Sequence, residues 1–386
     1  LRKPPLMSDR PLRIGITCHP SVGGSGILAS ELGAELAQRG HDVHFISHAA
    51  PFRMPRNQPR IHFHPVQVND YDLFKYPDYT LPLSVKMAEV AAAQRLDILH
   101  VHYAVPHATA AMLAMTMLPP GQRPRVVVTL HGTDVMLLGS DAGYGPAIRH
   151  ALESADAVTT VSRFLQGQVR TKLGYAGPVE VIPNFFAPQS PTRTRDTVRA
   201  ELGLAPGEAM LLHTSNLRPV KRIDLLLQTV AQIRPRESFK LVVLAGGDFS
   251  GFMAEAARLG IADRVVVREN VLAIEDYLHA ADLGLFTSEM ESFCLSILEA
   301  MTFGCPSAAF AVGGIAEVVE DGRSGALVPF GDTVALARAM ERLLADPARR
   351  DALGTAARER ALALFSADRV VARYVDFYRS VGSPQG

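Results

Sequence analysis

The sequence predicts an α/β protein with two domains, each built on a parallel sheet with helices on both faces. Short apolar runs of strand length alternate along the chain with segments of helical periodicity, which is typical of such sheets. The chain has 386 residues, of which 48% are hydrophobic. This is too long for one ordinary core, and the apolar content is sufficient for two.

The first half of the chain contains one alternating series. An apolar run over residues 12–18 ends in a glycine-rich stretch, and apolar residues at helical spacing follow over residues 27–39. This is the pattern of a strand, a loop and a helix. Further strands are predicted at residues 42–47, 98–102, 125–130 and 157–161, with helices at residues 83–94 and 166–173. The series predicts an N-terminal domain over residues 1–187.

A second series follows residues 184–197, which carry turn residues without apolar periodicity and are predicted to form the linker. Strands are predicted at residues 210–214, 240–245, 264–267 and 283–287, and helices at residues 223–233, 251–259, 274–280 and 293–303. These elements predict a C-terminal domain over residues 197–365.

The end of the chain, residues 333–381, is predicted to be helical, with breaks at Asp346-Pro347 and at Ser366. Its final helix, about residues 366–386, is expected to pack back onto the N-terminal domain. Since open α/β domains bind ligands at the carboxyl ends of their strands, the cleft between the two domains is the expected site.

The composition argues against several classes of function. Lys plus Arg and Asp plus Glu both number 39, so no net field favours nucleic acid or an anionic membrane, and small-molecule partners are expected. Cys18, Cys294 and Cys305 form no C-x-x-C pair, which disfavours a disulfide framework and a thiolate zinc site and fits a reducing cytoplasm. No apolar run approaches the ~20 residues that span a bilayer. Residues 1–11 lack the apolar region of a signal peptide and are expected to form a loose tail.

A glycine-rich loop joins the first strand to the first helix. Gly23-Gly24-Ser25-Gly26 allows the backbone to approach a phosphate at the positive end of a helix. The spacing is not G-x-G-x-x-G, so an ordinary tight turn is an equally good interpretation.

A cationic cluster follows the first strand of the second domain. Asn216, Arg218, Lys221 and Arg222 lie at its carboxyl end, where Arg offers a bidentate fork and Lys a point charge. Because cations oppose the dipole of a helix N-terminus, an anion such as a diphosphate would suit them. The alternative is a solvated basic helix start.

A helix is expected to begin close to Glu291. Ser292 is predicted to be its N-cap, so that the backbone N–H groups of Phe293, Cys294 and Leu295 are directed into the cleft. Glu291 then lies at the mouth of the site. Glu299, two turns along, accepts hydrogen bonds from ribose hydroxyls if it faces the cleft; taken alone, it is more simply a solvated helix residue.

Several histidines raise the question of a metal site. His100, His102, His107 and His131 have no Asp or Glu placed to complete a ligand set, and imidazoles at strand ends suit sugar hydroxyls equally well. No metal is therefore expected. His131, which is followed by Gly132-Thr133-Asp134 after a strand, is the strongest functional candidate, and its alternative role is to cap the next element.

Together these motifs resemble the family-four retaining glycosyltransferases of the GT-B fold, over nearly the whole chain. The motifs are Gly23-Gly24-Ser25-Gly26, His131-Gly132-Thr133-Asp134, the segment 215–222 and Glu291-x7-Glu299. Within the family the chain is most similar to the branch that transfers N-acetylglucosamine (GlcNAc) from UDP-GlcNAc to L-malate in bacillithiol biosynthesis. That similarity rests on the strings at residues 17–26, 51–53, 74–77 and 100–107.

The resemblance implies a metal-independent, cytoplasmic hexosyltransferase with UDP-GlcNAc and L-malate as its partners. It implies no contact with nucleic acid and no integral membrane contact. It is also compatible with a homodimer. The implied catalytic residues are Glu291 at the transferred sugar, His131 facing the sugar, and Arg218 and Lys221 at the diphosphate. The implied donor-binding residues are Gly23, Gly24, Asn216, Arg218, Lys221, Phe293, Cys294, Leu295 and, at the ribose, Glu299. The implied acceptor-binding residues are Ser25, Tyr103, Thr129, Arg149 and Lys86.

Arg149 is expected to supply the cation that a dicarboxylate needs, and its alternative role is a surface pair with Glu153. Two departures from the family pattern concern the donor loops. Cys294 stands where the family has Gly in E-S-F-G, and the segment 245–249 replaces G-D-G-P-E. A Cβ at position 294 is expected to require φ below zero.

Other functions remain open at this point. They are a family-four enzyme with another acceptor such as an inositol phosphate, a UDP-sugar 2-epimerase, and a nucleotide-sugar binding module without turnover. No carboxylate is obviously placed as a nucleophile, and the resemblance implies retention by same-face attack. UDP release that depends on an added acceptor separates these functions.

Overall fold

The chain divides into two compact units. The first unit is Leu1–Asn184 together with Ala367–Gly386, and the second is Phe185–Ser366. The structure, a computed structural model, describes residues 10–20, 23–55, 57–68, 78–234 and 238–382. Most of the expected loose tail and the string at residues 74–77 lie outside the described residues. None of the described helices has the length and apolar character needed to cross a bilayer.

A seven-stranded parallel sheet forms the centre of the first unit, in the order β3-β2-β1-β4-β5-β6-β7. The chain order reverses between β1 and β4, which is where open α/β sheets bind ligands. The strands are β1 (Arg13–Thr17), β2 (Asp42–Ser47), β3 (Ile61–Pro65), β4 (Ile98–His102), β5 (Arg125–Leu130), β6 (Ala157–Thr160) and β7 (Glu180–Val181). The predicted strands are confirmed to within a residue at each end, and the edge strands β3 and β7 were not predicted.

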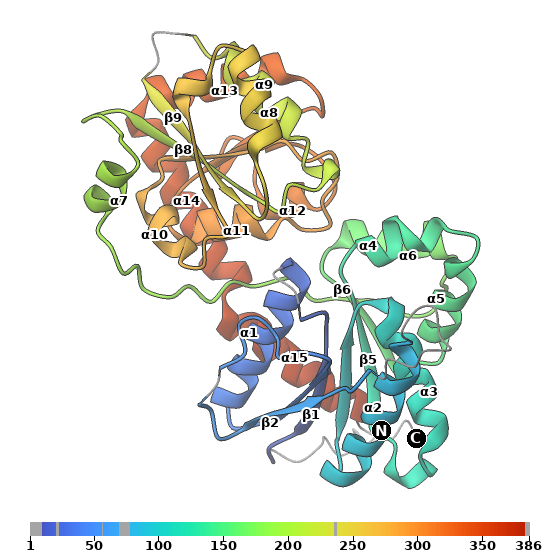
Figure 1. The fold of residues 1–386 in the computed structure, drawn as a ribbon. Coiled ribbons are helices and arrows are strands. Elements are labelled where there is room, and N and C mark those ends of the chain that lie inside the picture. The colour runs from blue at the N-terminus through green and yellow to red at the C-terminus, as the bar shows by residue number, and fades with distance from the viewer. Residues whose placement is uncertain (1–9, 21–22, 56, 69–77, 235–237, 383–386) are drawn as a thin grey trace, which may run out of the picture. The chain divides into compact units, whose positions relative to one another are not determined.

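Helices lie on both faces of this sheet (Figure 1). They are α1 (Gly24–Gln38), α2 (Thr80–Gln94), α3 (Thr109–Met117), α4 (Thr133–Met136), α5 (Tyr144–Glu153), α6 (Arg163–Leu173) and α15 (Ala367–Gly382). Helix α15, drawn in dark red, lies among the elements of the first unit against α1 and β5. Its Tyr374 and Tyr378 are almost fully buried. The C-terminal helix thus completes the first core, although the rest of that core comes from the first half of the chain.

The second unit contains a six-stranded parallel sheet in the order β10-β9-β8-β11-β12-β13. Its chain order reverses between β8 and β11, so this sheet also has a switch point. The strands are β8 (Ala209–Ser215), β9 (Phe239–Ala245), β10 (Val265–Glu269), β11 (Leu283–Phe286), β12 (Ser307–Phe310) and β13 (Gly325–Val328). The helices are α7 (Arg195–Glu201), α8 (Ile223–Gln232), α9 (Ser250–Arg258), α10 (Ile274–Ala280), α11 (Leu295–Thr302), α12 (Ile315–Val318), α13 (Thr333–Ala345) and α14 (Pro347–Phe365).

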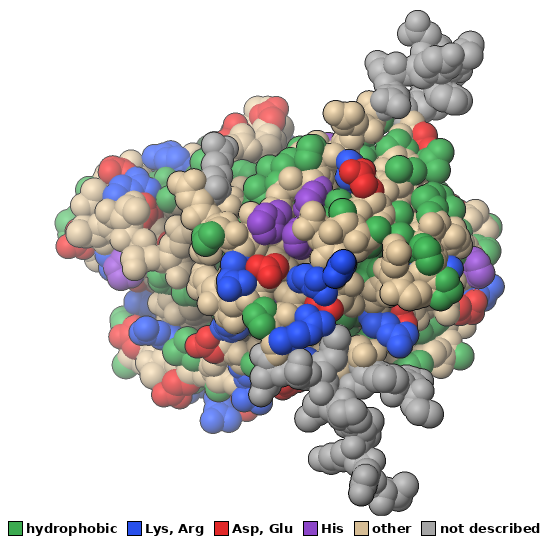
Figure 2. Space-filling view, turned by 90° about the horizontal axis from the view of Figure 1, so that it is seen from below, with side chains coloured by type: hydrophobic (Ala, Val, Ile, Leu, Met, Phe, Trp, Pro, Cys, Tyr) green, Lys and Arg blue, Asp and Glu red, His purple; other side chains and the backbone are tan. Residues whose placement is uncertain are grey.

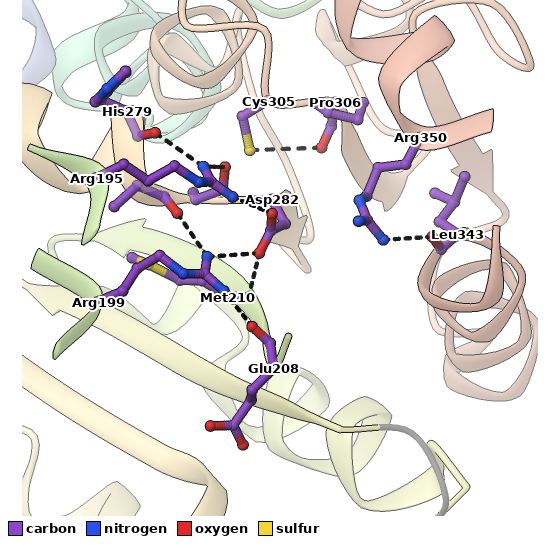
Figure 3. Close-up of polar contacts among 12 residues, drawn as sticks. Arg195, Arg199, Glu208, Met210, His279, Asp282, Cys305, Pro306, Leu343 and Arg350 are labelled. Atoms are coloured by element: carbon purple, nitrogen blue, oxygen red, sulfur yellow. Dashed lines mark hydrogen bonds and ion pairs between the residues drawn. The ribbon is translucent and has the colours of Figure 1, made fainter. Parts of the chain in front are cut away.

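Helix α7 begins inside the predicted linker and is fixed to the sheet by a charged group (Figure 3). Asp282 precedes β11 and accepts the backbone N–H of Met210 at 2.7 Å and Nη1 of Arg199 at 2.9 Å. Arg195 also pairs with Asp282, and Arg199 donates to the carbonyl of Glu208. These contacts make α7 part of the second unit, so the linker is shorter than the sequence predicts.

Candidate active site

In the first unit, the loops after β1, β4 and β5 meet at the switch point of the sheet. His19 follows β1, Tyr103 follows β4 and His131 follows β5. The His19 ring meets Tyr103 edge-on at 5.2 Å between centroids, and Tyr103 stacks on His131 at 5.8 Å. His107 lies 4.5 Å from His19 by the same measure. The three loops therefore bring imidazole and phenol groups together at the place where ligands bind in this class of sheet.

Both the backbone and the ring of His131 have protein partners. Nε2 of His131 lies 2.9 Å from Nδ1 of His102. The buried carboxylate of Asp134 accepts the backbone N–H groups of Gly132 at 2.8 Å and of His131 and Ala104 at 3.2 Å. Burial lowers the pKa of His131 to about 3 and raises the pKa of Asp134 to about 6. His131 is therefore neutral at pH 7, and its loop is held by Asp134.

The other predicted histidines have partners of their own. Nε2 of His100 lies 2.6 Å from Oγ1 of Thr129, and its Nδ1 lies 2.7 Å from the hydroxyl of Tyr378. Nδ1 of His107 lies 2.5 Å from the carbonyl of His102. Among the described residues, no group of three or more His, Cys, Asp or Glu is arranged to hold a metal ion. Thr129 itself is fully buried within this network.

Lys86, from the predicted acceptor set, lies on α2 and pairs with Glu89 at 2.7 Å. Burial, then the charges of His62 and Lys86, lower the pKa of His64 on the neighbouring strand β3. His44 stacks on His62 at 4.7 Å, and its Nδ1 lies 3.0 Å from Nε2 of His64. Figure 2 shows histidine side chains gathered on one face, with cationic and acidic side chains beside them. Lys86 thus lies beside the edge strand of the sheet.

The remaining predicted residues of the first unit lie on or before helices. Helix α1 begins at Gly24, three residues before the predicted start, so Gly24 and Ser25 lie in its first turn and Gly23 is its N-cap. Arg149 is exposed on α5. Its guanidinium lies beside Gly174, the residue that ends α6.

In the second unit, the loops after β8 and β11 are joined by an ion pair at the switch point. Nζ of Lys221 lies 2.5 Å from Oε1 of Glu291, which also accepts a hydrogen bond from Ser288 at 2.7 Å. Burial acts to lower the pKa of Lys221, but Glu291, together with Cys294, acts to raise it, and the net shift is upward. Arg218 contributes a second positive charge that acts on Lys221. Lys221 is thus largely removed from solvent, whereas Asn216 and Arg218 are exposed, and the anion site stays a prediction.

Backbone contacts fix the loop that carries Glu291. The N–H of Glu289 donates to the carbonyl of Val220 at 2.8 Å, and the N–H of Gly314 donates to the carbonyl of Glu291 at 2.8 Å. A Cβ added at Gly314 would collide with the carbonyl of Ser292. Glycine at this position therefore allows the loop after β12 to lie against the Glu291 loop. Asn216 is exposed at the end of β8, where Gly246 approaches its Cα.

Two predictions about the helix after Glu291 are wrong. The N-cap is Cys294 and not Ser292, because α11 begins at Leu295. Cys294 has φ +73°, so the expectation of a negative φ at this Cβ-bearing residue also fails. Phe293 is buried, and its ring meets Phe365 edge-on at 5.4 Å. The two residues before Cys294 are packed tightly: Phe293 contacts Phe365, and both Ser292 and Phe293 lie close to Gly314.

Glu299 is 6% exposed in the second turn of α11. The simpler interpretation as a solvated helix residue is therefore wrong. Burying a carboxylate costs free energy unless it is paired or hydrogen-bonded. Glu299 interacts with other residues of the protein, which offsets that cost, and its contact with the ribose stays a prediction.

Sequence reasoning missed four residues of these two clusters. His19 and Asp134 lie within the motifs at residues 17–26 and 131–134, but the sequence around a His or an Asp does not indicate which residues it contacts. Ser288 and Gly314 act on Glu291 from other loops. The positions of His19 and Asp134 just after predicted strands were the signal that could have identified them.

Comparisons with known proteins agree with this arrangement. The model of the family described as glycosyltransferase family 4 matches residues 22–189, and that of glycosyl transferases group 1 matches residues 194–360. The chain is 41% identical over 372 residues to N-acetyl-alpha-D-glucosaminyl L-malate synthase of Bacillus anthracis, covering 96% of this chain and 97% of that protein. It is 28% identical to a D-inositol 3-phosphate glycosyltransferase of Xylanimonas cellulosilytica, covering 92% and 91%.

Solved structures share the fold. Sucrose-phosphate synthase from Thermosynechococcus elongatus superposes with a TM-score of 0.78 at 24% identity, covering 96% of this chain and 99% of that chain. HepE from Anabaena in complex with UDP-glucose superposes with a TM-score of 0.78 at 21% identity, covering 96% and 100%. The two sheets, the residues at their switch points and a full-length relative lead to one assignment: the chain belongs to the family-four glycosyltransferases of the GT-B fold.

Proposed function

We propose that this glycosyltransferase transfers GlcNAc from UDP-GlcNAc to the hydroxyl of L-malate with retention of the anomeric configuration. The observation that carries the proposal is the 41% identity to the Bacillus anthracis malate synthase over 96% of the chain. The half-buried Lys221–Glu291 pair at the switch point of the second sheet supports it, since a sugar diphosphate needs a cation for its phosphates and a hydrogen-bond acceptor for its sugar hydroxyls.

In the proposed reaction, the bond between the anomeric carbon and the β-phosphate oxygen breaks as the malate hydroxyl oxygen attacks from the same face. The proton of that hydroxyl passes to the departing phosphate. Negative charge grows on the phosphate, so fixed positive charge there stabilises the transition state. Arg218 and Lys221 are proposed to supply it, Glu291 to bind the transferred sugar and Glu299 the ribose.

The proposal extends to the other sequence-predicted residues. The first turn of α1, with Gly24 and Ser25, contributes helix N–H groups of the kind that bind anions. Tyr103 and His131 are proposed to face the acceptor and the sugar, and Arg149 to pair with a malate carboxylate. Two cations and helix N–H groups replace the divalent ion that other diphosphate sites use, so we propose a metal-independent reaction.

An acceptor panel tests the proposal. Purified protein and UDP-GlcNAc are incubated with hydroxy acids, inositols and inositol phosphates, with and without EDTA, and products are identified by mass spectrometry and anomeric NMR. An α-linked GlcNAc-malate product that also forms in EDTA is expected. If inositol phosphate is the only acceptor that gives a product, the function would instead match that of the Xylanimonas cellulosilytica relative, which is 28% identical. UDP released without any acceptor would point to an epimerase.

A further inference from the structure

His102 has no assigned role in the transfer reaction, yet it is in direct contact with His131. It ends β4, its side chain is 1% exposed, and its ring lies between those of His100 and His131, at 4.2 and 5.2 Å between centroids. Nδ1 of His102 lies 2.9 Å from Nε2 of His131. Burial holds the pKa of both rings far below its ordinary value, so the contact joins two neutral imidazoles.

This contact determines which edge of His131 can meet a substrate. The backbone of His131 is held by the carboxylate of Asp134 at 3.2 Å, and its ring stacks on Tyr103. Because Nε2 is engaged by His102, a hydrogen bond from the His131 ring to a substrate has to use Nδ1. A neutral imidazole carries one proton, so if His102 is the donor in this contact, Nδ1 of His131 carries the proton and donates, and if His131 is the donor, its Nδ1 accepts.

Packing alone does not explain a histidine at position 102. Its second nitrogen, Nε2, is buried and has no hydrogen-bond partner among the described residues. An unsatisfied buried nitrogen costs stability, and an apolar side chain of similar size would avoid that cost. The hydrogen bond of Nδ1 to His131 is therefore what a histidine provides at this position and an apolar residue does not.

We propose that His102 is a positioning residue, which holds Nε2 of His131 through its Nδ1 and so presents the Nδ1 edge of His131 to the substrate in a single protonation state. The inference rests on the proposed function for the identity of the substrate. The pairing of the two rings does not depend on that identity.

Two variants of nearly equal shape separate positioning from packing. His102→Asn keeps a polar atom at the place of Nδ1, whereas His102→Leu places a methyl group there, and both remove the ring. The Leu variant is expected to lose at least tenfold in kcat with KM for UDP-GlcNAc changed less than twofold, and the Asn variant to recover most of the loss. Equal losses in both folded variants would overturn the proposal, because packing would then explain them.

A second measurement needs no variant at position 102. In protein labelled with 15N-histidine, His131, assigned by its loss in His131→Gln, is expected to show one fixed neutral tautomer between pH 8 and pH 6. Two tautomers in fast exchange would overturn the proposal even if neither His102 variant folds. Failure of the unmodified enzyme to form GlcNAc-malate would instead count against the proposed function, and the NMR result would still decide the role of His102.

Discussion

Nζ of Lys221 lies 2.5 Å from Oε1 of Glu291, across a sequence separation of 70 residues. The side chains are only 17% and 11% exposed. Each charge offsets the desolvation of the other, so neither can be removed without leaving its partner buried and uncompensated. The same pair brings the proposed phosphate cation and the proposed sugar ligand together at one switch point.

Lys221→Ala tests the phosphate role. We expect kcat to fall by a factor that corresponds to about 2–4 kcal/mol, because Lys221 is proposed to bind the phosphate more strongly as charge develops on it. The KM for UDP-GlcNAc should change less than kcat. Steady-state kinetics with both substrates varied measure the two effects. Glu291→Gln, which keeps the shape of the side chain, serves as the companion variant. An unchanged kcat in Lys221→Ala would mean that the diphosphate does not bind at Lys221.

The positive φ of Cys294 leads to an expected order of stability among variants at this position. A residue with a Cβ at φ +73° costs about 1–2 kcal/mol relative to one in the ordinary regions, and glycine avoids that cost. Cys294→Gly should therefore have a free energy of unfolding about 1 kcal/mol above that of Cys294→Ala, which retains the strain. Urea unfolding of both variants measures the difference. An alanine variant as stable as the glycine variant would show that the backbone at 294 relaxes.

Strands β1, β4 and β5, which the sequence predicts, are buried along nearly their whole length, as is typical of the central strands of a parallel sheet. The missed strand β3 reads Ile61-His62-Phe63-His64-Pro65 and lies partly exposed beside β2. It has no two adjacent apolar residues like Ile98-Leu99 of β4, and it ends in Pro65, so no strand was predicted there. Strands β12 (Ser-Ala-Ala-Phe) and β13 (Gly-Ala-Leu-Val) were not predicted either. At least half of their residues are small, so neither has a run of large apolar residues to detect.

The site was predictable where it follows directly from strand ends. His131 and Lys221 come after predicted strands, and the carboxyl ends of parallel strands meet at one edge. The pairing of His102 with His131 depends on side-chain orientations, and the segment just before Cys294 contacts Gly314 and Phe365, which are distant in the sequence. Such tertiary constraints have no local signal in the sequence, which is why the N-cap and the backbone of Cys294 were predicted wrongly.

Gly314→Ala should disturb the Glu291 loop. The added Cβ would collide with the carbonyl of Ser292 and approach Cα of Phe293 at 3.1 Å, so backbone has to move. We expect a loss of about 1–3 kcal/mol in the free energy of unfolding, with a lower kcat, measured by urea unfolding and steady-state kinetics. Gly251→Ala in α9 is the matched control, since nothing lies within 4 Å of its Cβ. A Gly314→Ala enzyme that matches this control in stability and kcat would contradict the expectation.

The buried histidines predict a steep loss of stability in acid. Burial lowers the pKa of His100, His107 and His131 to about 3 and holds that of His102 well below its ordinary value. In the unfolded chain histidine has a pKa of about 6.5, so below that pH the unfolded state binds more protons and is favoured. Each histidine contributes a slope of up to about 1.4 kcal/mol per pH unit between pH 6.5 and its folded pKa.

Asp134 acts in the opposite direction. Its pKa, raised to about 6 by burial, makes the folded state bind the extra proton between about pH 4 and pH 6. One proton of this kind is outweighed by four histidines, so the net stability should fall from pH 6.5 downward. Urea unfolding at pH 7, 6 and 5 measures the slope. Replacing the exposed His150 with Gln should leave it unchanged, and a flat profile would mean that the buried rings ionise without unfolding.

The acceptor assignment depends on Arg149. Malate carries two carboxylates, and binding them away from water without a cation costs several kcal/mol. Arg149 is exposed on α5, with its guanidinium beside Gly174 at the end of α6. Arg149→Ala should raise the KM for malate at least tenfold while leaving the KM for UDP-GlcNAc and the Tm nearly unchanged. The KM for malate of Arg149→Lys should lie between those of the unmodified enzyme and Arg149→Ala, because lysine keeps the charge but loses the bidentate fork.

Arg170→Ala is the matched control for this variant, because it removes an exposed positive charge from the last turn of α6, the helix whose end lies beside the Arg149 guanidinium. A general loss of positive charge would affect both variants equally, whereas a direct carboxylate contact affects Arg149 alone. If malate saturation is the same in Arg149→Ala and in the unmodified enzyme, Arg149 is a surface cation at the negative end of α6. The cation that binds the acceptor would then have to be sought among other residues of the enzyme.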